Sequence, residues 1–376
     1  MSHILTLLIG QSVPLPVPVD VLDALDSIEI THADDSAAGL QIKLRISRSG
    51  FADMVDYGLV QGMVSKPFSR IVVIVTIDFM PQVLFDGFVT HTELVPSNQP
   101  SMSHLVVTAE DATVLMDMEE KREEHPAQDE MAISMKILAQ YADAGVVPMV
   151  IPPPMIDQPV PVDRTPVQQG TDLAFLRTMA SRFGYVFYLV PGPAPCLVTA
   201  YWGPPKREGV PQKTLAINFG AATNVDSLQF STNALAPTTW YSRVQDRSTD
   251  EVMPVESFAA TRIPLSSSPA IMSNTKVRKR WIGGSGLTSS QVYSRVQELT
   301  NLSTDNVVTG TGELDCRRYG AVLHTHELVG VRGAGFTNDG FYYVKRVTHH
   351  VTRQSYRQSF TITRDGTGST TTAVPA

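Results

Sequence analysis

Alternating apolar and polar residues in the first third of the chain predict β-strands. Residues 40–46 alternate between aliphatic and polar side chains, the period-two pattern of a strand with one buried and one solvated face. Residues 71–79 are almost all apolar, which indicates a strand buried on both faces or at a subunit contact. With strands also expected at 85–94 and 104–110, residues 1–111 are predicted to form one antiparallel β-domain, closed into a barrel that hides its edges.

Helical spacing replaces this alternation in the middle of the chain. Apolar residues recur at intervals of three and four over 131–142, which predicts an amphipathic helix. A second helix is predicted to begin at Thr171 or Asp172, either of which can cap it, and a strand follows it. Residues 112–200 are therefore expected to form an α/β insertion domain that contains an extended, proline-rich linker at 147–168.

The β pattern resumes in the last part of the chain. Residues 201–366 are predicted to form a second β-domain, with a Ser-, Thr- and Pro-rich irregular excursion at 245–290 and a short helix at about 290–302. The final residues, 367–376, are expected to be a disordered tail. The predicted fold class is therefore mostly β with an α+β insertion.

A short motif occurs twice in the sequence. It is written Phe85-Asp86-Gly87-Phe88-Val89 and again Asn338-Asp339-Gly340-Phe341-Tyr342-Tyr343-Val344. Each copy is followed at nearly the same distance by a return strand that ends at Asp111 or Asp365. An Asp-Gly turn that enters a strand is typical of a β-hairpin, and such turns are common enough for a chance match. If the match is genuine, the chain holds two related β-domains, and a ring of such chains has twice as many equivalent positions as subunits.

Composition and charge narrow the function classes. Hydrophobic residues make up 43% and charged residues 18% of the chain, the composition of a globular protein. A net charge of −7 argues against a nucleic-acid-binding surface as the main function. One basic cluster stands out at Lys276, Arg278, Lys279 and Arg280, followed by Trp281. A solvated loop or a patch that meets an acidic neighbouring subunit explains this cluster better than contact with RNA or DNA.

Cysteine content and hydropathy address the compartment. The sequence contains two cysteines, Cys196 and Cys316, without CxxC spacing, so neither a disulfide framework nor a zinc knuckle is predicted. The apolar run at 4–9 lacks the flanking charges and the length of a Sec signal peptide. No stretch approaches the roughly 20 apolar residues of a membrane helix. We expect synthesis in the bacterial cytoplasm and no direct membrane insertion.

Catalytic and metal-binding motifs are weak. His324-Thr325-His326 would place two imidazoles on one face of a strand, and His349-His350 follows nearby, so a zinc-dependent hydrolase is a hypothesis. No HExxH-type motif accompanies these histidines, and exposed or hydrogen-bonded strand histidines are the simpler interpretation. A GxSxG nucleophile elbow and a Walker-type loop are also missing from the sequence. We therefore predict no catalytic, cofactor-binding or metal-ligating residues and no enzyme activity.

Three segments together resemble a known family. The segment from Thr171-Asp172 through Phe175-Leu176 to Gly184-Tyr185 resembles the capped helix, glycine and aromatic strand of the phage late control protein D family. These are the baseplate hub proteins of contractile tails and contractile injection systems, and they are related to the N-terminal half of the VgrG spike of type VI secretion. The segments around Asp86-Gly87-Phe88 and around Asp339-Gly340 and Tyr343 resemble the family's hairpins. The resemblance covers residues 20–366.

The resemblance implies a structural role. It implies two tube-like antiparallel β-barrels in each chain and a homotrimer, so that six barrels form a pseudo-hexameric ring. Such a ring joins a hexameric inner tube, or a tube-initiator protein, to a trimeric spike that is a separate polypeptide, and it contacts other baseplate proteins. The resemblance offers no cofactor and no catalytic residues. The alternative is a surface- or carbohydrate-binding β module of a phage-like particle, for which Tyr185, Tyr188, Tyr342 and Tyr343 could form aromatic platforms.

Overall fold

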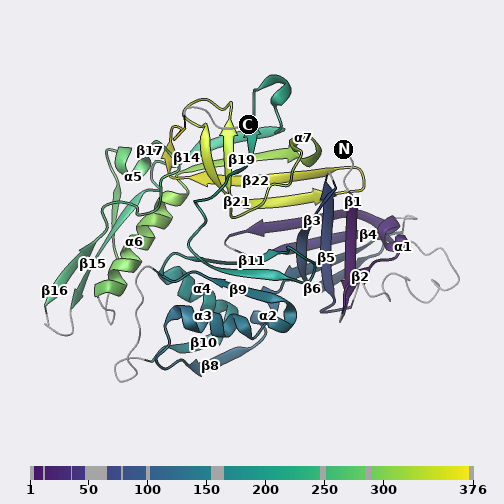
Figure 1. Ribbon diagram of the computed structural model, residues 1–376, viewed down its shortest axis with the longest axis horizontal. Helices are drawn as coiled ribbons and strands as arrows, with labels where there is room; N and C mark the ends of the chain where they lie inside the picture. Colours follow the sequence, from purple (N-terminus) through teal and green to yellow (C-terminus); the bar gives the residue numbers. More distant parts are fainter. Residues whose placement is uncertain are drawn as a thin grey trace.

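One large curved sheet organises the molecule. The computed structural model describes residues 4–11, 13–34, 36–46, 66–77, 79–98, 102–153, 165–245, 251–283 and 289–371. The sheet has 13 strands, and its hydrogen-bonded path is β14-β19-β22-β21-β3-β4-β7-β6-β5-β1-β2, with β20 beside β21 and β13 beside β20. Figure 1 shows this sheet running across the molecule, with the helical insertion below it and a smaller lobe to one side. The described chain is therefore mostly β, as the sequence predicts.

The N-terminal half supplies seven strands and one short helix. These are β1 (Ile4–Gly10), β2 (Leu15–Pro16), α1 (Val19–Ala24), β3 (Leu25–Ala33), β4 (Gly39–Ile46), β5 (Arg70–Ile77), β6 (Met80–Val95) and β7 (Ser103–Asp111). Alternate residues of β4 are buried, which confirms the period-two pattern predicted for it, and alternate residues of β7 are buried as well. Residues 70–73 of β5 are buried on both faces within the single chain, so the apolar run needs no subunit contact to cover it.

The C-terminal half repeats this arrangement. Its elements are β13 (Gln212–Ala216), the 3₁₀ helix η4 (Gly220–Ala222), β14 (Ser227–Thr232), β19 (Val308–Asp315), α7 (Cys316–Tyr319), β20 (Leu328–Arg332), β21 (Gly340–Val351), β22 (Tyr356–Arg364) and β23 (Gly366–Thr367). Five strands of each half share one topology, with β14, β19, β20, β21 and β22 corresponding to β3, β4, β5, β6 and β7. Both halves therefore pair their first, second, fifth, fourth and third strands in that order.

A β-bulge fixes how the two halves superimpose. The ladder between β6 and β7 shifts register between Val89 and His91, and the ladder between β21 and β22 shifts between Val344 and Arg346. Aligning the bulges makes Val89 equivalent to Val344, and both lie on the buried face. In this alignment Asp339 corresponds to Leu84, so the two Asp-Gly motifs occupy positions that differ by two residues. The repeat is real at the level of strand order, but the motif that suggested it is not its structural counterpart.

The two halves are joined edge to edge. Strand β21 pairs with β3 in an antiparallel ladder from Arg346 opposite Ala33 to Val351 opposite Ile28. The hydroxyls of Thr31 and Thr348 are 3.1 Å apart across this ladder. A single hydrophobic core also continues through both halves, with Leu44 and Val107 from one half and Val347 and Phe360 from the other. The predicted pair of β-units therefore exists as one continuous sheet over one core.

The insertion between the halves is a compact α/β unit. It comprises α2 (Thr113–Met116), β8 (Glu120–Glu124), α3 (Glu130–Ala139), the 3₁₀ helix η3 (Ala142–Ala144), β9 (Val146–Val150), β10 (Val167–Thr171), α4 (Asp172–Arg182), β11 (Val186–Pro191) and β12 (Val198–Gly203). Thr171 caps α4 by accepting a hydrogen bond from the backbone N–H of Ala174, at 3.2 Å, which confirms that cap. Leu176, Met179 and Trp202 lie at the centre of a separate buried cluster.

A smaller outer lobe lies beside the C-terminal half. It contains β15 (Thr238–Gln245), β16 (Val252–Glu256), β18 (Arg278–Trp281) and the long helix α6 (Ser289–Asp305), with β17 (Ser268–Pro269) and α5 (Ala270–Ser273) between them. The strands pair in the order β16-β15-β18, and Val244 and Val255 pack against Val292 and Val296 of α6. In Figure 1 this lobe projects to the left of the sheet.

Several sequence-based expectations need correction. The predicted irregular excursion at 245–290 contains β16 and β18, because β15 supplies both with a hydrogen-bonding partner. The predicted proline-rich linker begins with strand β9, which pairs in parallel with β12. The predicted tail begins with β23, which pairs with β17, whereas residues 372–376 lie outside the described residues. Residues 154–164 of the linker also lie outside the described residues.

The first Asp-Gly pair is not a turn. Asp86 and Gly87 lie inside β6, where Asp86 is opposite Val72 and Gly87 opposite both Ile71 and Asp111. The second pair does precede a strand, since β21 begins at Gly340 with φ +130°. A Cβ at Gly340 would also lie 2.9 Å from a guanidinium nitrogen of Arg364. Only the second motif therefore has the turn role that the sequence indicated.

We expect Gly340→Ala to destabilise the fold. An L-residue is strained at this φ, and the expected loss is about 1–3 kcal/mol of unfolding free energy. Gly39→Ala is the control, because nothing lies within 4 Å of a Cβ at Gly39. Chemical denaturation of both variants measures the difference. Equal midpoints for the two variants would contradict the strain assigned to Gly340.

Candidate functional site

The residues singled out by the sequence gather at contacts between parts of the chain. Asp86, Gly87 and Phe88 lie where β6 meets the insertion. Asp172, Phe175, Leu176, Gly184 and Tyr185 lie within the insertion or at its contact with α6. Asp339, Gly340 and Tyr343 lie around the start of β21. They do not converge on one cleft. The candidate site therefore consists of several contacts between different parts of the chain, here called joints, together with one histidine-lined cavity.

Asp86 ties the first β-unit to the insertion. Its side chain is fully buried and accepts a hydrogen bond from Nε of Arg70 at 2.6 Å and from the backbone N–H of Cys196 at 2.8 Å. Arg70 lies on β5, and Cys196 lies in the turn between β11 and β12. The guanidinium of Arg70 also lies 5.6 Å from the ring centroid of Phe88. Removing Asp86 would leave a buried cation and a buried N–H without their acceptor.

Gly87 permits the close approach of β7. A Cβ at this position would lie 2.1 Å from the carbonyl oxygen of Glu110, a contact that real side chains do not make. Asp111, at the end of β7, accepts hydrogen bonds from the backbone N–H groups of Ala38 at 2.8 Å and Thr113 at 2.9 Å. Burial raises the pKa of Asp111, although these hydrogen bonds oppose the shift. The Asp111 carboxylate therefore fixes the backbone at Ala38, just before β4, and at Thr113, the first residue of α2.

Asp172 organises the insertion through three donors. Lys121 Nζ lies 2.7 Å from its Oδ2, the Tyr141 hydroxyl donates to the same oxygen at 2.6 Å, and Gln168 donates to Oδ1 at 2.6 Å. Burial alone would raise the pKa of Asp172, but these three hydrogen bonds hold it below its usual range. Phe175 and Leu176 are buried on the same helix, α4, so this part of the family signature builds the core of the insertion.

Gly184 contacts a buried charge cluster that the sequence did not reveal. Arg262 pairs with both Glu298 and Asp305 of α6, Arg207 pairs with Asp305, and Arg262 donates to the Gly184 carbonyl at 2.9 Å. Gly184 has φ +56°, and a Cβ there would overlap the Glu298 carboxyl. Burial raises the pKa of Glu298 to about 7, against the attraction of Arg262. The cluster holds the insertion against the outer lobe.

The start of β21 is held by a buried arginine. Arg364 of β22 is fully buried, donates to the Asp339 carbonyl at 2.9 Å, and stacks over the Tyr342 ring with 4.4 Å to its centroid. The Asp339 carboxylate accepts from the backbone N–H of Ala334 at 2.7 Å, which closes the loop before the strand. Arg364 was not singled out by the sequence, because nothing local distinguishes it from a surface arginine.

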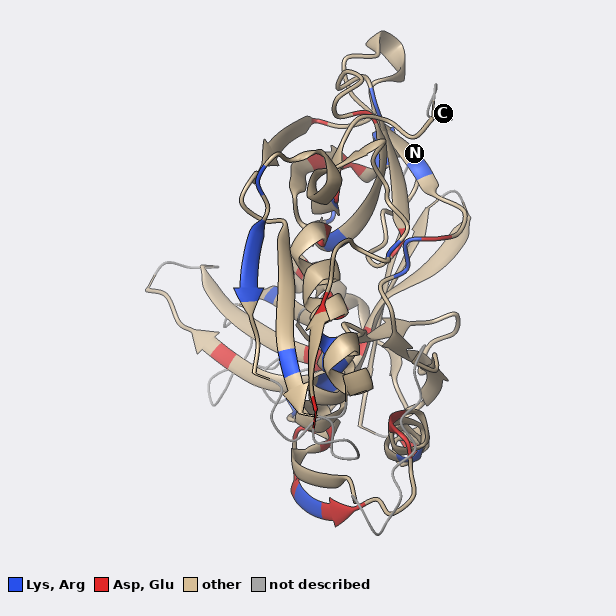
Figure 2. Ribbon diagram, turned by 90° about the vertical axis from the view of Figure 1, so that its left-hand side faces the viewer, with Lys and Arg blue, Asp and Glu red and all other residues tan. Residues whose placement is uncertain are grey.

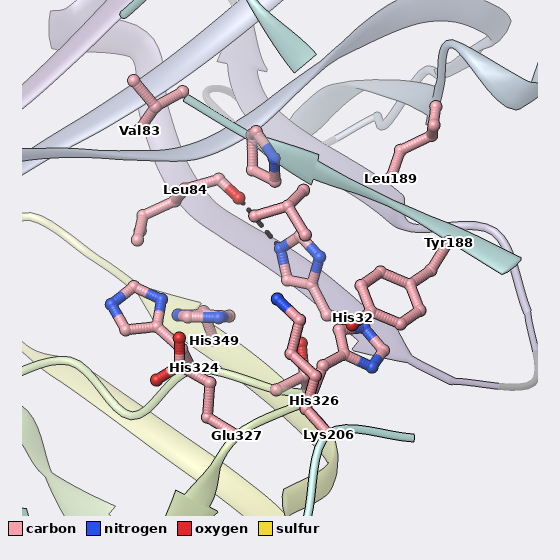
Figure 3. A pocket seen from close by; sticks show the side chains of 13 residues that line it. His32, Val83, Leu84, Tyr188, Leu189, Lys206, His324, His326, Glu327 and His349 are labelled. Carbon is pink, nitrogen blue, oxygen red and sulfur yellow. Dashed lines mark hydrogen bonds between the residues drawn. The ribbon is translucent and has the colours of Figure 1, made fainter. Parts of the chain in front are cut away.

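A cavity of about 250 Å³ lies where the N-terminal half, the C-terminal half and the insertion meet. Its walls include His32 of β3, Tyr188 of β11, Lys206, His349 of β21, and the residues around His324 and His326 before β20. Figure 3 shows these side chains converging from different elements on one space. The rings of His32 and His349 are 5.6 Å apart edge to face, and His326 stacks on Tyr188 at 3.5 Å.

Burial keeps the histidines of this cavity neutral, whereas the hydrogen bond to the Leu84 carbonyl opposes the fall in the pKa of His32. His32 Nε2 lies 2.8 Å from the Leu84 carbonyl oxygen, drawn as a dashed line in Figure 3. His349 Nδ1 lies 2.8 Å from the Tyr356 hydroxyl and 3.3 Å from the Gln358 amide nitrogen. Burial lowers the pKa of His32 to about 4 and lowers the pKa values of His324, His326 and His349 as well. Once one histidine is protonated, its positive charge lowers the pKa of the neighbouring histidines further.

The geometry does not favour the zinc hypothesis. His324 and His326 lie in a turn before β20, not on one strand face, and His326 has φ +66°. His349 points into the cavity, whereas His350 is exposed beside Glu29. Within the described parts of the chain, no three His, Cys, Asp or Glu side chains are placed to hold a metal ion. The described helices include none that is long and apolar enough to span a membrane.

The aromatic residues proposed as ligand platforms are packed inside. Tyr188, Tyr342 and Tyr343 are buried, and Tyr185 is half-buried with its hydroxyl donating to the Pro152 carbonyl at 3.0 Å. Tyr343 places its hydroxyl 3.3 Å from His326 Nδ1 at the cavity wall. These rings therefore stabilise the joints, and no observation favours a carbohydrate-binding role for them.

Comparison with known proteins shows that the chain shares its fold with solved structures of low sequence identity. No protein-family model and no curated protein matches the chain. The tail protein from Neisseria meningitidis MC58 shares the fold, with 11% identity, 97% of each chain covered and a TM-score of 0.67. The 43 kDa tail protein of prophage MuSo2 from Shewanella oneidensis is 11% identical over 97% of this chain and 99% of that chain, with a TM-score of 0.65.

A third structure extends this likeness to secretion systems. It is an E. coli protein described as a component of the type VI secretion system with structural similarity to T4 bacteriophage tail proteins gp27 and gp5. It is 12% identical, with 90% of this chain and 73% of that chain covered and a TM-score of 0.56. The chain therefore has the fold of phage tail and type VI secretion proteins, in agreement with the family resemblance in its sequence.

We expect Asp86→Asn to be strongly destabilising. Removing one partner of a buried ion pair costs about 3–5 kcal/mol, because the remaining charge stays buried. Asp26→Asn is the matched control, since Asp26 pairs with Arg45 at 3.2 Å in an exposed site, where the expected cost is about 0–1 kcal/mol. Urea denaturation measures both. A cost for Asp86→Asn no larger than that of the control would show that this joint contributes little.

We expect the protein to lose stability in mild acid. The unfolded chain binds protons on histidine near pH 6.5, whereas His32 stays neutral in the fold down to about pH 4. The stability linked to His32 is therefore fully present above pH 6.5 and is lost as the pH drops through this window, whereas Glu298, whose folded pKa is raised to about 7, acts in the opposite direction. His32→Asn should reduce the number of protons taken up on unfolding by about one. Melting temperatures across this range test the expectation, with exposed His91→Asn as the control, and equal slopes for both variants would contradict it.

Proposed function

We propose that the chain is a structural hub of a contractile phage tail-like injection particle. Three copies would form a ring whose six β-units join a hexameric inner tube to a trimeric spike. The observation that carries this proposal is the repeated strand order of the two halves, which ends in two unpaired strand edges. The shared fold with tail and type VI secretion proteins supports the same role.

The junction inside the chain suggests how two chains would meet. Strand β21 of the second unit pairs on its far side with β3 of the first unit. By the same topology, β6 of the first unit would pair with the strand equivalent to β3, which is β14 of a partner subunit. Residues 91–95 of β6 pair only with β7, and β14 pairs only with β19, so both edges are available among the described strands.

The bulge alignment sets the register of this contact. Thr348 corresponds to Glu93, and Thr31 corresponds to Ser231, so Glu93 would lie opposite Ser231 of the partner subunit. Leu94 would then lie opposite Phe230 of the partner subunit, with both on the apolar face. In this register Leu94 meets an apolar residue and Glu93 a polar one, whereas Val95 would lie opposite Gln229 of the partner subunit. A register shifted by one residue would break this match.

Head-to-tail pairing of this kind forms a closed ring when the rotation between copies closes. With three copies, the ring has two β-units per subunit and so presents six similar positions to a hexameric tube and three identical ones to a spike. Two pairs of equivalent polar positions carry uncharged side chains, with Gln41 and Thr108 matched by Thr311 and Thr361, whereas Lys43 is matched by Glu313. This face would line the channel of the ring.

The proposal includes the surroundings of the ring. The spike would be a separate trimeric protein on one side, an inner-tube or tube-initiator protein would lie on the other, and other baseplate proteins would contact the outside. The chain would be made in the bacterial cytoplasm and incorporated into the baseplate. No nucleic acid is proposed as a partner, because the chain carries a net charge of −7.

A disulfide between subunits tests the proposed register. In a variant with Glu93→Cys and Ser231→Cys, mild oxidation should yield a covalent ring that runs as a trimer on a non-reducing gel. Within one chain the two positions lie at opposite ends of eight strands, roughly 35 Å apart at the usual strand spacing, so an internal bridge is excluded.

The control pairs Glu93→Cys with Ser227→Cys. Ser227 lies on the same exposed face of β14, roughly 13 Å along the strand, and should not cross-link. The native Cys196 and Cys316 are replaced by serine and alanine in both variants. Cross-linking of the control pair but not of the test pair, or dimers that never proceed to trimers, would overturn the proposed ring contact.

A further inference from the structure

The outer lobe carries a basic strand that the ring proposal does not use. Strand β18 consists of Arg278, Lys279, Arg280 and Trp281, and all four residues are exposed. Lys276 precedes it, so four cations occupy five positions of a chain whose net charge is −7. Figure 2 shows the strand as a run of blue along one side of the lobe.

The backbone of β18 has an open edge. Strand β15 lies between β16 and β18, so β18 is paired on one side only within the described chain. The backbone N–H of Ile282 donates to the Tyr241 carbonyl at 3.0 Å and so points toward β15. Because strand residues alternate in direction, the N–H and C=O groups of Lys279 and Trp281 point outward. They are free to bond with an added strand.

The opposite edge of the lobe is blocked. Strand β16 carries Pro254, opposite Arg243 of β15, and proline at an edge prevents the addition of another strand. No proline interrupts β18. Of the two edges of this small sheet, only the β18 edge is therefore suited to pairing with an added strand.

The side chains of β18 are held in place by aromatic rings. Lys279 lies 5.3 Å from the ring centroid of Tyr241 and pairs with Glu256, and Arg280 lies 5.8 Å from the ring centroid of Trp240. Trp281 stacks edge to face on Tyr241 at 5.3 Å, yet half of its surface is exposed. Among the described residues, Glu256 is the carboxylate that forms an ion pair with this strand, so most of its charge is uncompensated.

We propose that β18 is a docking edge for an acidic, extended segment of another protein of the particle. The segment adds as a strand to β18, its carboxylates meet the cations on both faces, and Trp281 supplies an apolar anchor. The inference rests on the proposed function for its partner, a neighbouring baseplate protein. A second copy of β18 is excluded as the occupant, because its cations would repel those already present.

Fluorescence anisotropy tests this docking on the isolated full-length chain. The probe is a short labelled peptide in which Glu alternates with Val and Thr. We expect it to bind in physiological salt, whereas the same peptide with Lys in place of Glu does not. The triple variant R278E/K279E/R280E should bind at least about tenfold more weakly, since attraction becomes repulsion. The control triple reverses the exposed cations Lys66, Arg122 and Arg295 and should bind normally.

A backbone variant separates strand addition from simple charge attraction. Lys279→Pro removes an outward N–H and leaves the inward bonds to β15, so it should weaken binding by about three- to tenfold relative to Lys279→Gln. Equal binding by these two variants would overturn strand addition. Failure of the acidic peptide to bind, or tighter binding of a single-stranded DNA oligomer, would overturn the acidic partner. None of these results depends on ring formation, so the disulfide test of the hub stands apart from them.

Discussion

The antiparallel pairing of β3 with β21 is the contact on which the rest of the structure depends. It joins residues more than three hundred positions apart and converts two β-units into one sheet over one core. Because it uses the outer edge of each unit, it leaves one unpaired edge at each end of the eight-strand path from β14 to β6. The same contact, repeated between chains, is the simplest way to cover those edges, since an exposed sheet edge is otherwise an aggregation risk.

The joints around this sheet are built from buried polar groups. Asp86, Asp172 and the Arg262 cluster each accept or donate several hydrogen bonds across element boundaries. Such groups fix relative orientation, because a displaced partner leaves a buried charge unpaired. In the proposed hub role between a tube and a spike, the chain would need defined orientation more than surplus stability. The histidine cavity at the meeting point of the three parts adds a dependence on neutral pH.

The sequence predicted what is local and missed what is long-range. The period-two strand at 40–46 and the capped helix α4 follow from spacing and capping chemistry within a few residues. The role of Asp86 was missed, because its donors Arg70 and Cys196 come from other segments and an Asp-Gly pair ordinarily indicates a turn. His32 and Arg364 carry no local signal, because the groups that surround them come from other segments, Leu84 and His349 for His32 and Asp339 and Tyr342 for Arg364. Strand β18 was expected to be irregular, because residues 245–290 are rich in Ser, Thr and Pro, and the partner strand β15 comes from an earlier part of the chain.

The most direct test of the account is the solution mass of the full-length chain by light scattering, alone and with the spike protein of its particle co-expressed. The chain has a mass of 41.0 kDa. If the unpaired edges of β14 and β6 close a ring, we expect three times this mass, either alone or once the spike is present. A chain that remains monomeric in both conditions would contradict the ring and leave the fold without the function proposed for it.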